Sequence, residues 1–157
     1  MSTAVDRVRQ ALATLGLPVQ VTEFDQSTAT SQQAADTLGV PLATIVKSLV
    51  FLAGEQPILV LASGANRVDT GKLARSAGAR IKKADADCVR QATGFVIGGV
   101  APVGHATPLP VYIDRDLLQY DLLWAAAGSP YAVFPISPSD LVRITSGQVV
   151  DLAQEQA

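Results

Sequence analysis

The sequence predicts an α+β (mixed α/β) fold in one domain that spans residues 1–157. Short runs of β-branched and aliphatic residues, about seven of them, alternate with short segments of helical period. Two of these runs are joined by Gly54-Glu55-Gln56, a loop length typical of an antiparallel hairpin. A hairpin within an irregular order of strands and helices favours this fold class over a doubly wound parallel sheet. Because 48% of the residues are hydrophobic, the chain can bury a core.

Periodicity and capping residues locate the expected helices. Apolar residues from Val5 to Leu15 recur at helical spacing, which predicts a helix over 3–15 that ends at Gly16. The same signals predict helices over 31–38, 70–77 and about 85–93, ended by Gly39, Gly78 and Gly94, and helical turns over 41–44, 115–118 and 137–141.

Apolar runs between turn residues locate the expected strands. These lie over 19–24, 45–52, 57–62, 111–113, 122–126, 131–136 and 149–150. The segment that starts at Ile81 is expected to be a basic connector, and 94–97 an apolar strand that breaks into a loop.

The charge is unevenly distributed along the chain. The formal net charge is −2, which is not typical of a protein that binds nucleic acid non-specifically and argues against DNA as a partner. Seven of the twelve basic residues lie between Arg67 and Arg90 with only three aspartates, so this segment carries +4 and the rest of the chain −6. The segment is either a solvated helix face or a local surface that contacts phosphate groups.

Other features exclude several classes of site and location. The single cysteine, Cys88, precludes an intrachain disulfide, fits a cytoplasmic location, and is expected to be a bystander within a helix. Charged residues near the start argue against a signal peptide, and prolines interrupt the uncharged stretch 91–113, so no membrane helix is expected. One histidine and one cysteine make a metal site unlikely on composition, and no phosphate-binding glycine motif indicates a nucleotide cofactor.

A glycine- and proline-rich loop over 94–105 is the most distinctive stretch. Gly98 and Gly99 remove side chains where the backbone could approach a ligand, and Pro102 restricts the chain that follows. The loop ends at His105, which has no evident partner in the sequence to orient it as a general base. The loop is therefore either a tight corner of a sheet or a cradle of backbone N–H groups.

Two further positions carry candidate chemistry. Lys47 lies within an apolar strand, either on its exposed face or as a cation that lines a pocket and faces a phosphate or carbonyl oxygen. Gly128-Ser129-Pro130 is either a hairpin turn or a second pocket wall with a hydroxyl donor. The Gly-x-Ser-x-Gly motif of a nucleophile elbow is absent.

Three stretches together resemble the YbaK/ProX-type editing domains: Ile45–Phe51, Gly94–His105 and Gly128-Ser129. The resemblance extends from about residue 5 to 150 in an unbroken order. These domains are aminoacyl-tRNA deacylases that clear misacylated prolyl-tRNA, either as free-standing proteins or as an insertion within prolyl-tRNA synthetase. The resemblance implies a curved, mostly antiparallel or mixed sheet flanked by helices, and hydrolysis of the aminoacyl ester at the terminal adenosine without a cofactor.

The resemblance also assigns roles to individual residues. Lys47 matches the functional lysine, and Gly98–Pro102 matches the Gly-x-x-x-Pro loop at the pocket. The expected catalytic residues are Lys47, Gly98 and Gly99, and the expected substrate-binding residues are Val100, Ala101, Pro102, His105, Gly128 and Ser129. Backbone N–H groups of the glycines would stabilise an oxyanion, while Lys47 would hold the terminal phosphate or ribose. From the basic segment we further expect tRNA phosphate contacts by Arg67, Lys72, Lys82 and Lys83.

The resulting hypothesis is a trans-editing hydrolase that acts on misacylated tRNA(Pro). Because His105 fits the family members that end this loop in histidine, alanine is favoured over cysteine as the amino acid removed. The expected partners are the acceptor end of tRNA and prolyl-tRNA synthetase. Two other hypotheses remain open: a non-catalytic module that binds tRNA or a synthetase, and a hydrolase of small-molecule esters.

Overall fold

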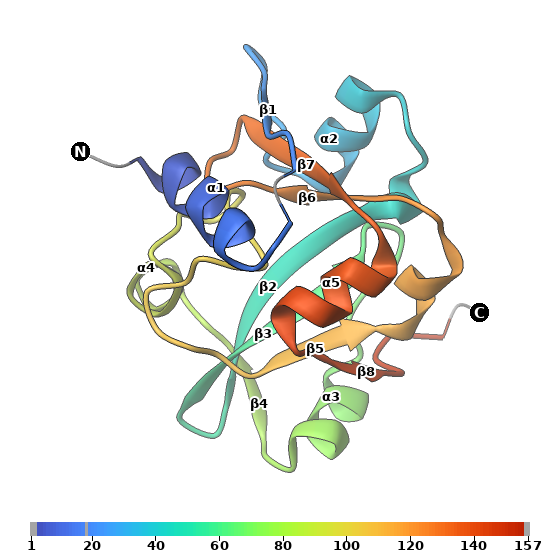
Figure 1. The fold of residues 1–157 in the computed structure, drawn as a ribbon. Coiled ribbons are helices and arrows are strands. Elements are labelled where there is room, and N and C mark those ends of the chain that lie inside the picture. Colours follow the sequence, from blue (N-terminus) through green and yellow to red (C-terminus); the bar gives the residue numbers. More distant parts are fainter. Residues whose placement is uncertain (1–2, 18, 156–157) are drawn as a thin grey trace.

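The computed structural model describes residues 3–17 and 19–155 and has a mixed β-sheet at its centre (Figure 1). Within this described part the sheet has eight strands, ordered β1-β7-β6-β2-β3-β5-β8, with β4 paired to β2. The strands are β1 Thr22–Glu23, β2 Ile45–Ala53, β3 Gln56–Ser63, β4 Ile81–Lys83, β5 Val111–Asp114, β6 Leu123–Ala126, β7 Ala132–Ile136 and β8 Gln148–Val150. The helices are α1 Ala4–Thr14, α2 Ser31–Leu38, α3 Thr70–Ala77, α4 Ala86–Thr93 and α5 Pro138–Thr145, with 3₁₀ turns η1 Leu42–Thr44 and η2 Arg115–Gln119.

The strand pairing confirms the predicted α+β class and the mixed sheet. The β2–β3 pair is an antiparallel hairpin, as expected. The β6–β7 pair is one too, which is the hairpin alternative for Gly128-Ser129-Pro130, and β1 and β4 also pair in antiparallel fashion. In contrast, β2–β6, β3–β5 and β5–β8 are parallel. Among the described residues, no helix is long and apolar enough to cross a membrane.

The structure selects one residue from each pair of caps that the sequence allows, which are Thr30 or Ser31, Asp69 or Thr70, and Asp85 or Asp87. Thr30, Asp69 and Asp85 each accept a backbone N–H from the first turn of α2, α3 and α4, which satisfies a donor that the helix itself cannot pair. The three helices end at Gly39, Gly78 and Gly94 in the left-handed conformation that glycine adopts without strain.

The core lies on both faces of the sheet. Along β3, Leu59 and Leu61 pack with α1, α4 and α5 on one face, while Ile58, Val60 and Ala62 pack with α3 on the other. Figure 1 shows α1 and α5 in front of the sheet. Because side chains alternate along a strand, burial of every position from Ile58 to Ser63 requires cover on both faces.

Two local predictions are wrong. The basic connector is a strand, because β4 pairs with Phe51–Ala53 of β2 through the main chain, a contact that its charged side chains do not reveal. The expected strand over 94–97 is a turn closed by the bond from Gly99 N–H to Val96 O (3.0 Å). Phe95 is buried at this turn, whereas the side chain of Ile97 is 62% exposed.

The second edge of β2 contains a gap that defines the candidate site. Along this edge, β6 pairs with Ile45 and Val46, and β4 pairs with Phe51–Ala53. Between them, 47–49 pair with β3 alone among the described strands. The sheet therefore offers an unpaired stretch of strand in its interior, where a ligand can reach the backbone and side chains of β2.

Candidate functional site

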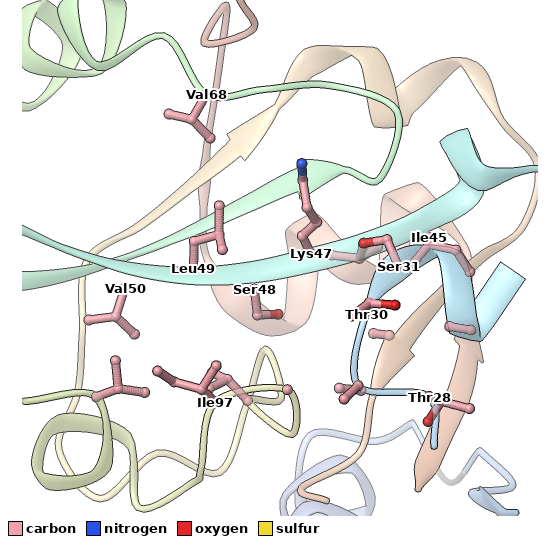
Figure 2. A pocket seen from close by; sticks show the side chains of 18 of the residues that line it. Thr28, Thr30, Ser31, Ile45, Lys47, Ser48, Leu49, Val50, Val68 and Ile97 are labelled. Carbon is pink, nitrogen blue, oxygen red and sulfur yellow. The ribbon is translucent and has the colours of Figure 1, made fainter. Parts of the chain in front are cut away.

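A cavity of about 760 Å³ opens at the gap in the sheet (Figure 2). One wall is β2 from Ile45 to Phe51. The other walls are the segment 28–31 at the start of α2, the turn at Ile97 and Gly98, and the chain at Arg67 and Val68. The remaining lining residues come from α2, α3, α4, β4, β6 and β7, together with Ala84, Val100 and Gln154. The volume lies within the range of about 300–1,000 Å³ typical of small-molecule sites.

Lys47 reaches this cavity from the middle of β2. Its side chain is half-buried and its Nζ donates to the backbone oxygen of Asn66. Figure 2 shows the chain extending from β2 on the same side as Leu49. Burial lowers the pKa of the Lys47 ammonium, and nearby Arg67 acts in the same direction, whereas the Asp114 carboxylate opposes both.

Ser48 lies on the other side of the same strand and was not predicted as a site residue. Its side chain lines the cavity and extends in the direction of Ile97 (Figure 2). Its Oγ is buried and has no hydrogen-bond partner among the described residues. A buried hydroxyl without a partner is costly, which makes it a candidate contact for a polar ligand atom. The only sequence signal is a hydroxyl residue beside the lysine in an apolar strand.

The charge of the cavity wall is entirely positive. Lys47, Arg67 and Lys83 line it, and no aspartate or glutamate does so in the described part of the chain. None of the three cations forms an ion pair with the residues that the structure describes. The cavity therefore favours a ligand that carries an anionic group such as a phosphate.

Gly98 and Gly99 lie at a close approach of three chain segments. A Cβ on Gly98, whose φ is +89°, would come within 2.9 Å of Ala29 Cβ, and one on Gly99 within 2.8 Å of Ser129 Cα. The structure thus brings the glycine pair together with the predicted Gly128-Ser129 turn and with the segment at Ala29. Close packing of backbone is a sufficient reason for glycine at both positions.

The two glycine N–H groups differ in what they can donate to. Gly99 N–H is engaged with Val96 O, and Gly99 is not among the lining residues. Gly98 lines the cavity, and its N–H has no acceptor among the described residues. Of the two oxyanion donors expected from the sequence, only Gly98 N–H is free for that role in this structure.

Most of the described site candidates from 100 to 105 stabilise the loop and do not line the cavity. Val100 lines the cavity, whereas Ala101, Pro102 and His105 do not. His105 Nε2–H donates to Ala101 O (2.7 Å), and its ring meets Phe95 edge-on with centroids 6.0 Å apart. Burial lowers the pKa of the His105 imidazole. His105 therefore stabilises the loop through its contacts with Ala101 and Phe95.

Gly128 and Ser129 also lie outside the cavity wall. A Cβ on Gly128 would come within 2.7 Å of Ala4 O at the start of α1. Ser129 Oγ accepts the N–H of Tyr131 (3.1 Å), a bond within the hairpin turn. Gly99 packs against this turn, so the turn affects the cavity indirectly, by positioning the loop that carries Gly98.

The four predicted phosphate contacts fall into two groups. Arg67 and Lys83 line the cavity and are exposed, and Lys82 is exposed beside Lys83 on β4. Lys72 instead forms an ion pair with Asp151 (3.1 Å) and donates to Ala153 O (2.9 Å). Two of the four therefore lie at the cavity, whereas Lys82 is exposed next to Lys83 but does not line the cavity, and Lys72 is engaged with the C-terminal segment.

The segment 28–31 at the start of α2 forms a wall of the cavity, and none of its residues was predicted as a site residue. Thr28, Ala29, Thr30 and Ser31 all line the cavity. Thr28 donates both its backbone N–H (2.7 Å) and its Oγ1 (3.0 Å) to Pro130 O, which ties this wall to the β6–β7 turn. Nothing in a local sequence pattern indicates a contact between segments about a hundred residues apart.

The fold and cavity define a small α+β domain whose cavity wall, among the described residues, carries cations and no carboxylate. Residues 25–144 match the model of the aminoacyl-tRNA editing domain. The chain belongs to this family, as the resemblance predicted.

Individual relatives agree with this assignment. The chain is 36% identical over 137 residues to the uncharacterised protein YwhH of Bacillus subtilis (strain 168), covering 86% of this chain and 87% of that protein. Proline–tRNA ligase of Xanthomonas campestris pv. campestris (strain 8004) is 36% identical over 89 residues, which cover 56% of this chain and 16% of the ligase. A crystal structure described as "a putative trans-editing enzyme for prolyl tRNA synthetase" superimposes with a TM-score of 0.93 at 46% identity, covering 99% of each chain.

Proposed function

We propose that this protein is a trans-editing deacylase for misacylated tRNA(Pro), with alanine as the preferred amino acid. The single observation that carries the proposal is the cavity at the gap in β2. Among the described residues, a lysine ammonium, a hydroxyl without a partner and a Gly98 N–H without an acceptor lie around a space that no carboxylate lines. Family membership supports the reaction class. The single cysteine and a tRNA substrate both fit the cytoplasm.

The size and charge of the cavity fit the end of a tRNA and not its body. A space of about 760 Å³ accepts an aminoacyl group with its adenosine, whereas a duplex stem must remain outside. Arg67 and Lys83 are exposed and line the cavity, and Lys82 is the exposed neighbour of Lys83 on β4; all three would suit the phosphates that precede the terminal adenosine. We therefore assign acceptor-end contacts to these three residues.

The proposed chemistry is attack of water on the ester carbonyl, with the ribose oxygen leaving as a hydroxyl. The aminoacyl ester is already activated, so positioning and charge stabilisation can suffice without a protein nucleophile. Gly98 N–H would donate to the developing oxyanion, and Ser48 Oγ would hold the substrate at the cavity floor. Loss of one such donor typically costs about 2.7–4 kcal/mol of transition-state stabilisation. Lys47 would hold the terminal phosphate or ribose.

A panel of mischarged tRNAs tests this function. We expect the protein to deacylate alanyl-tRNA(Pro) faster than cysteinyl-tRNA(Pro) and to leave prolyl-tRNA(Pro) intact. Faster removal of cysteine would overturn the amino-acid assignment alone. No hydrolysis above the buffer rate for any small amino acid would overturn the enzymatic function and favour a module that only binds tRNA or a synthetase.

A further inference from the structure

Asp114 at the end of β5 is a buried carboxylate that makes no contact with the cavity. Its residue is 0% exposed, and it is the one fully buried charged residue in the described part of the chain. Its oxygens accept the backbone N–H groups of Ser63 (3.0 Å) and Asp116 (3.0 Å) and the side-chain amide of Asn66 (2.9 Å). No lysine, arginine or histidine within the described residues pairs with it. A buried charge held by N–H donors alone is costly and calls for a reason.

Asn66 connects this carboxylate to the candidate site. Its Nδ2 donates to both Asp114 Oδ2 and Asp116 Oδ2 at 2.9 Å, so the side chain is held by two acceptors. Its backbone N–H donates to Ser63 O (2.9 Å), which closes the turn after β3. Its backbone oxygen accepts the Lys47 ammonium. Both donor groups of Asn66 are therefore engaged, its Nδ2 with Asp114 and Asp116 and its N–H with Ser63, and its backbone oxygen is engaged with Lys47.

We propose that Asp114 is a positioning residue for Lys47 and acts through the Asn66 turn. The carboxylate holds the turn, the turn aims the Asn66 carbonyl, and that carbonyl holds the lysine ammonium at the cavity. Asp114 touches neither ligand nor reacting atoms. The inference rests on the proposed function in one respect, which is that Lys47 contacts the substrate in that proposal.

The charges around Lys47 agree with this role. Burial and Arg67 lower the pKa of the Lys47 ammonium, and Asp114 is the group that raises it. Asp116 shares the Asn66 side-chain amide with Asp114, and Lys83 on β4 pairs with Phe51, which lies four positions along β2 from Lys47. Removal of the Asp114 charge therefore lowers the pKa of Lys47 further and moves loss of its proton to lower pH.

The test compares Asp114→Asn with Asp121→Asn, an identical change at an exposed position. The pKa of Lys47 is measured by NMR titration of its side-chain CεH₂ signal from about pH 7 to 12, with the signal assigned from its loss in Lys47→Met. The pH dependence of kcat and KM for alanyl-tRNA(Pro) is measured in parallel. We expect Asp114→Asn to lower the pKa of Lys47, shift the alkaline limb of kcat in the same direction and reduce kcat about ten- to a hundredfold, with KM little changed. Asp121→Asn should leave all of these unchanged.

A second variant keeps the test decisive if Asp114→Asn does not fold. Asn66→Ala retains the backbone oxygen that Lys47 contacts but removes the amide that ties it to Asp114 and Asp116. We expect it to change the Lys47 CεH₂ signal and to lower kcat. An unchanged Lys47 titration in the variants that fold would overturn the positioning role. If wild-type protein titrates as expected but hydrolyses no aminoacyl-tRNA, the proposed function fails while the positioning role stands.

Discussion

The hydroxyl of Ser48 differs in kind from the other serine hydroxyl buried in this part of the sheet. Ser63 Oγ donates to Ala43 O (2.7 Å) and accepts the N–H of Ala65 (3.3 Å), so it contributes to the folded state. Ser48 Oγ has neither kind of contact among the described residues. A buried hydroxyl that costs stability in the free protein and faces a cavity is best explained by a hydrogen bond to a bound ligand.

This contrast predicts opposite effects of the same substitution at two positions. Ser48→Ala should leave the free energy of unfolding unchanged or raise it by up to about 1 kcal/mol, and should lower kcat/KM for aminoacyl-tRNA. Ser63→Ala, the matched control, should lower the free energy of unfolding by about 1 kcal/mol because two hydrogen bonds are lost. Chemical denaturation and deacylation kinetics measure both. A Ser48→Ala protein that is less stable yet fully active would contradict this account.

His105 makes a second prediction, which concerns pH. Burial places its folded-state pKa below the unfolded value of 6.5, so the unfolded chain binds the proton first as the pH falls. Stability is therefore complete above about pH 6.5 and declines below it, with a slope of at most about 1.4 kcal/mol per pH unit. His105 is the one histidine in the sequence, so few other groups titrate in this window.

The measurement is the free energy of unfolding between about pH 5.5 and 7.5 for wild type and His105→Gln. Glutamine can donate to Ala101 O but does not titrate in this range, so the variant should show a flatter dependence. Equal slopes in the two proteins would show that the ring is not shielded from protonation. Activity of the variant should change little at neutral pH, because His105 does not line the cavity.

At the scale of elements, the loop over 94–105 packs directly against the backbone of the β6–β7 turn, so that the two are expected to move together. Gly99→Ala would place a Cβ 2.8 Å from Ser129 Cα, and backbone cannot yield as a flexible side chain does. We expect this variant to lose about 1–3 kcal/mol of stability. It should also lower activity, because the loop that must move is the one that places Gly98 at the cavity. Gly54→Ala is the control: its φ of +61° is strained for alanine, but no atom lies within 4 Å of the added Cβ. It should lose about 1 kcal/mol and keep full activity. Full stability and activity of Gly99→Ala would refute the close packing.

Local elements were predictable from the sequence because their signals are local. The caps Thr30, Asp69 and Asp85 and the two hairpins lie within a few residues of the structure that they specify. The pairing of β4 with β2 was missed because main-chain pairing between distant segments leaves no mark on a basic sequence. The gap in β2 could not be predicted either, since it exists only where β6 stops and β4 begins.

The candidate site was predictable where residue type alone is unusual. A lysine within an apolar strand and a glycine pair before a proline stand out, and the structure places Lys47 and Gly98 at one cavity. Ser48 and the wall at Thr28 did not stand out, because a serine or threonine becomes informative only when its burial and partners are known. Gly99 was expected to be a donor and instead packs against Ser129, a distinction that only geometry makes.

At the scale of the whole molecule, the chain is acidic, whereas the charged residues that line the cavity among the described residues, Lys47, Arg67 and Lys83, are all basic. Because a net charge of −2 does not favour nucleic acid in general, the proposed tRNA binding would depend on local cations, namely Arg67 and Lys83 at the cavity and Lys82 next to Lys83. Lys83→Ala is expected to weaken tRNA binding and to reduce the slope of log affinity against log salt by about one. Lys72→Ala, whose ammonium is engaged with Asp151 and Ala153, should change neither. Titrations at several salt concentrations measure both, and equal effects of the two substitutions would place the tRNA elsewhere.

The central claim is that Lys47 at the gap in β2 serves hydrolysis of an aminoacyl ester. The most direct measurement is the single-turnover rate of alanyl-tRNA(Pro) hydrolysis by wild type, Lys47→Ala and Lys47→Met, with folding of each confirmed by its unfolding transition. We predict rapid hydrolysis by wild type and a loss of about a hundredfold or more in both variants. A folded Lys47→Met protein that hydrolyses alanyl-tRNA(Pro) at the wild-type rate would contradict the account.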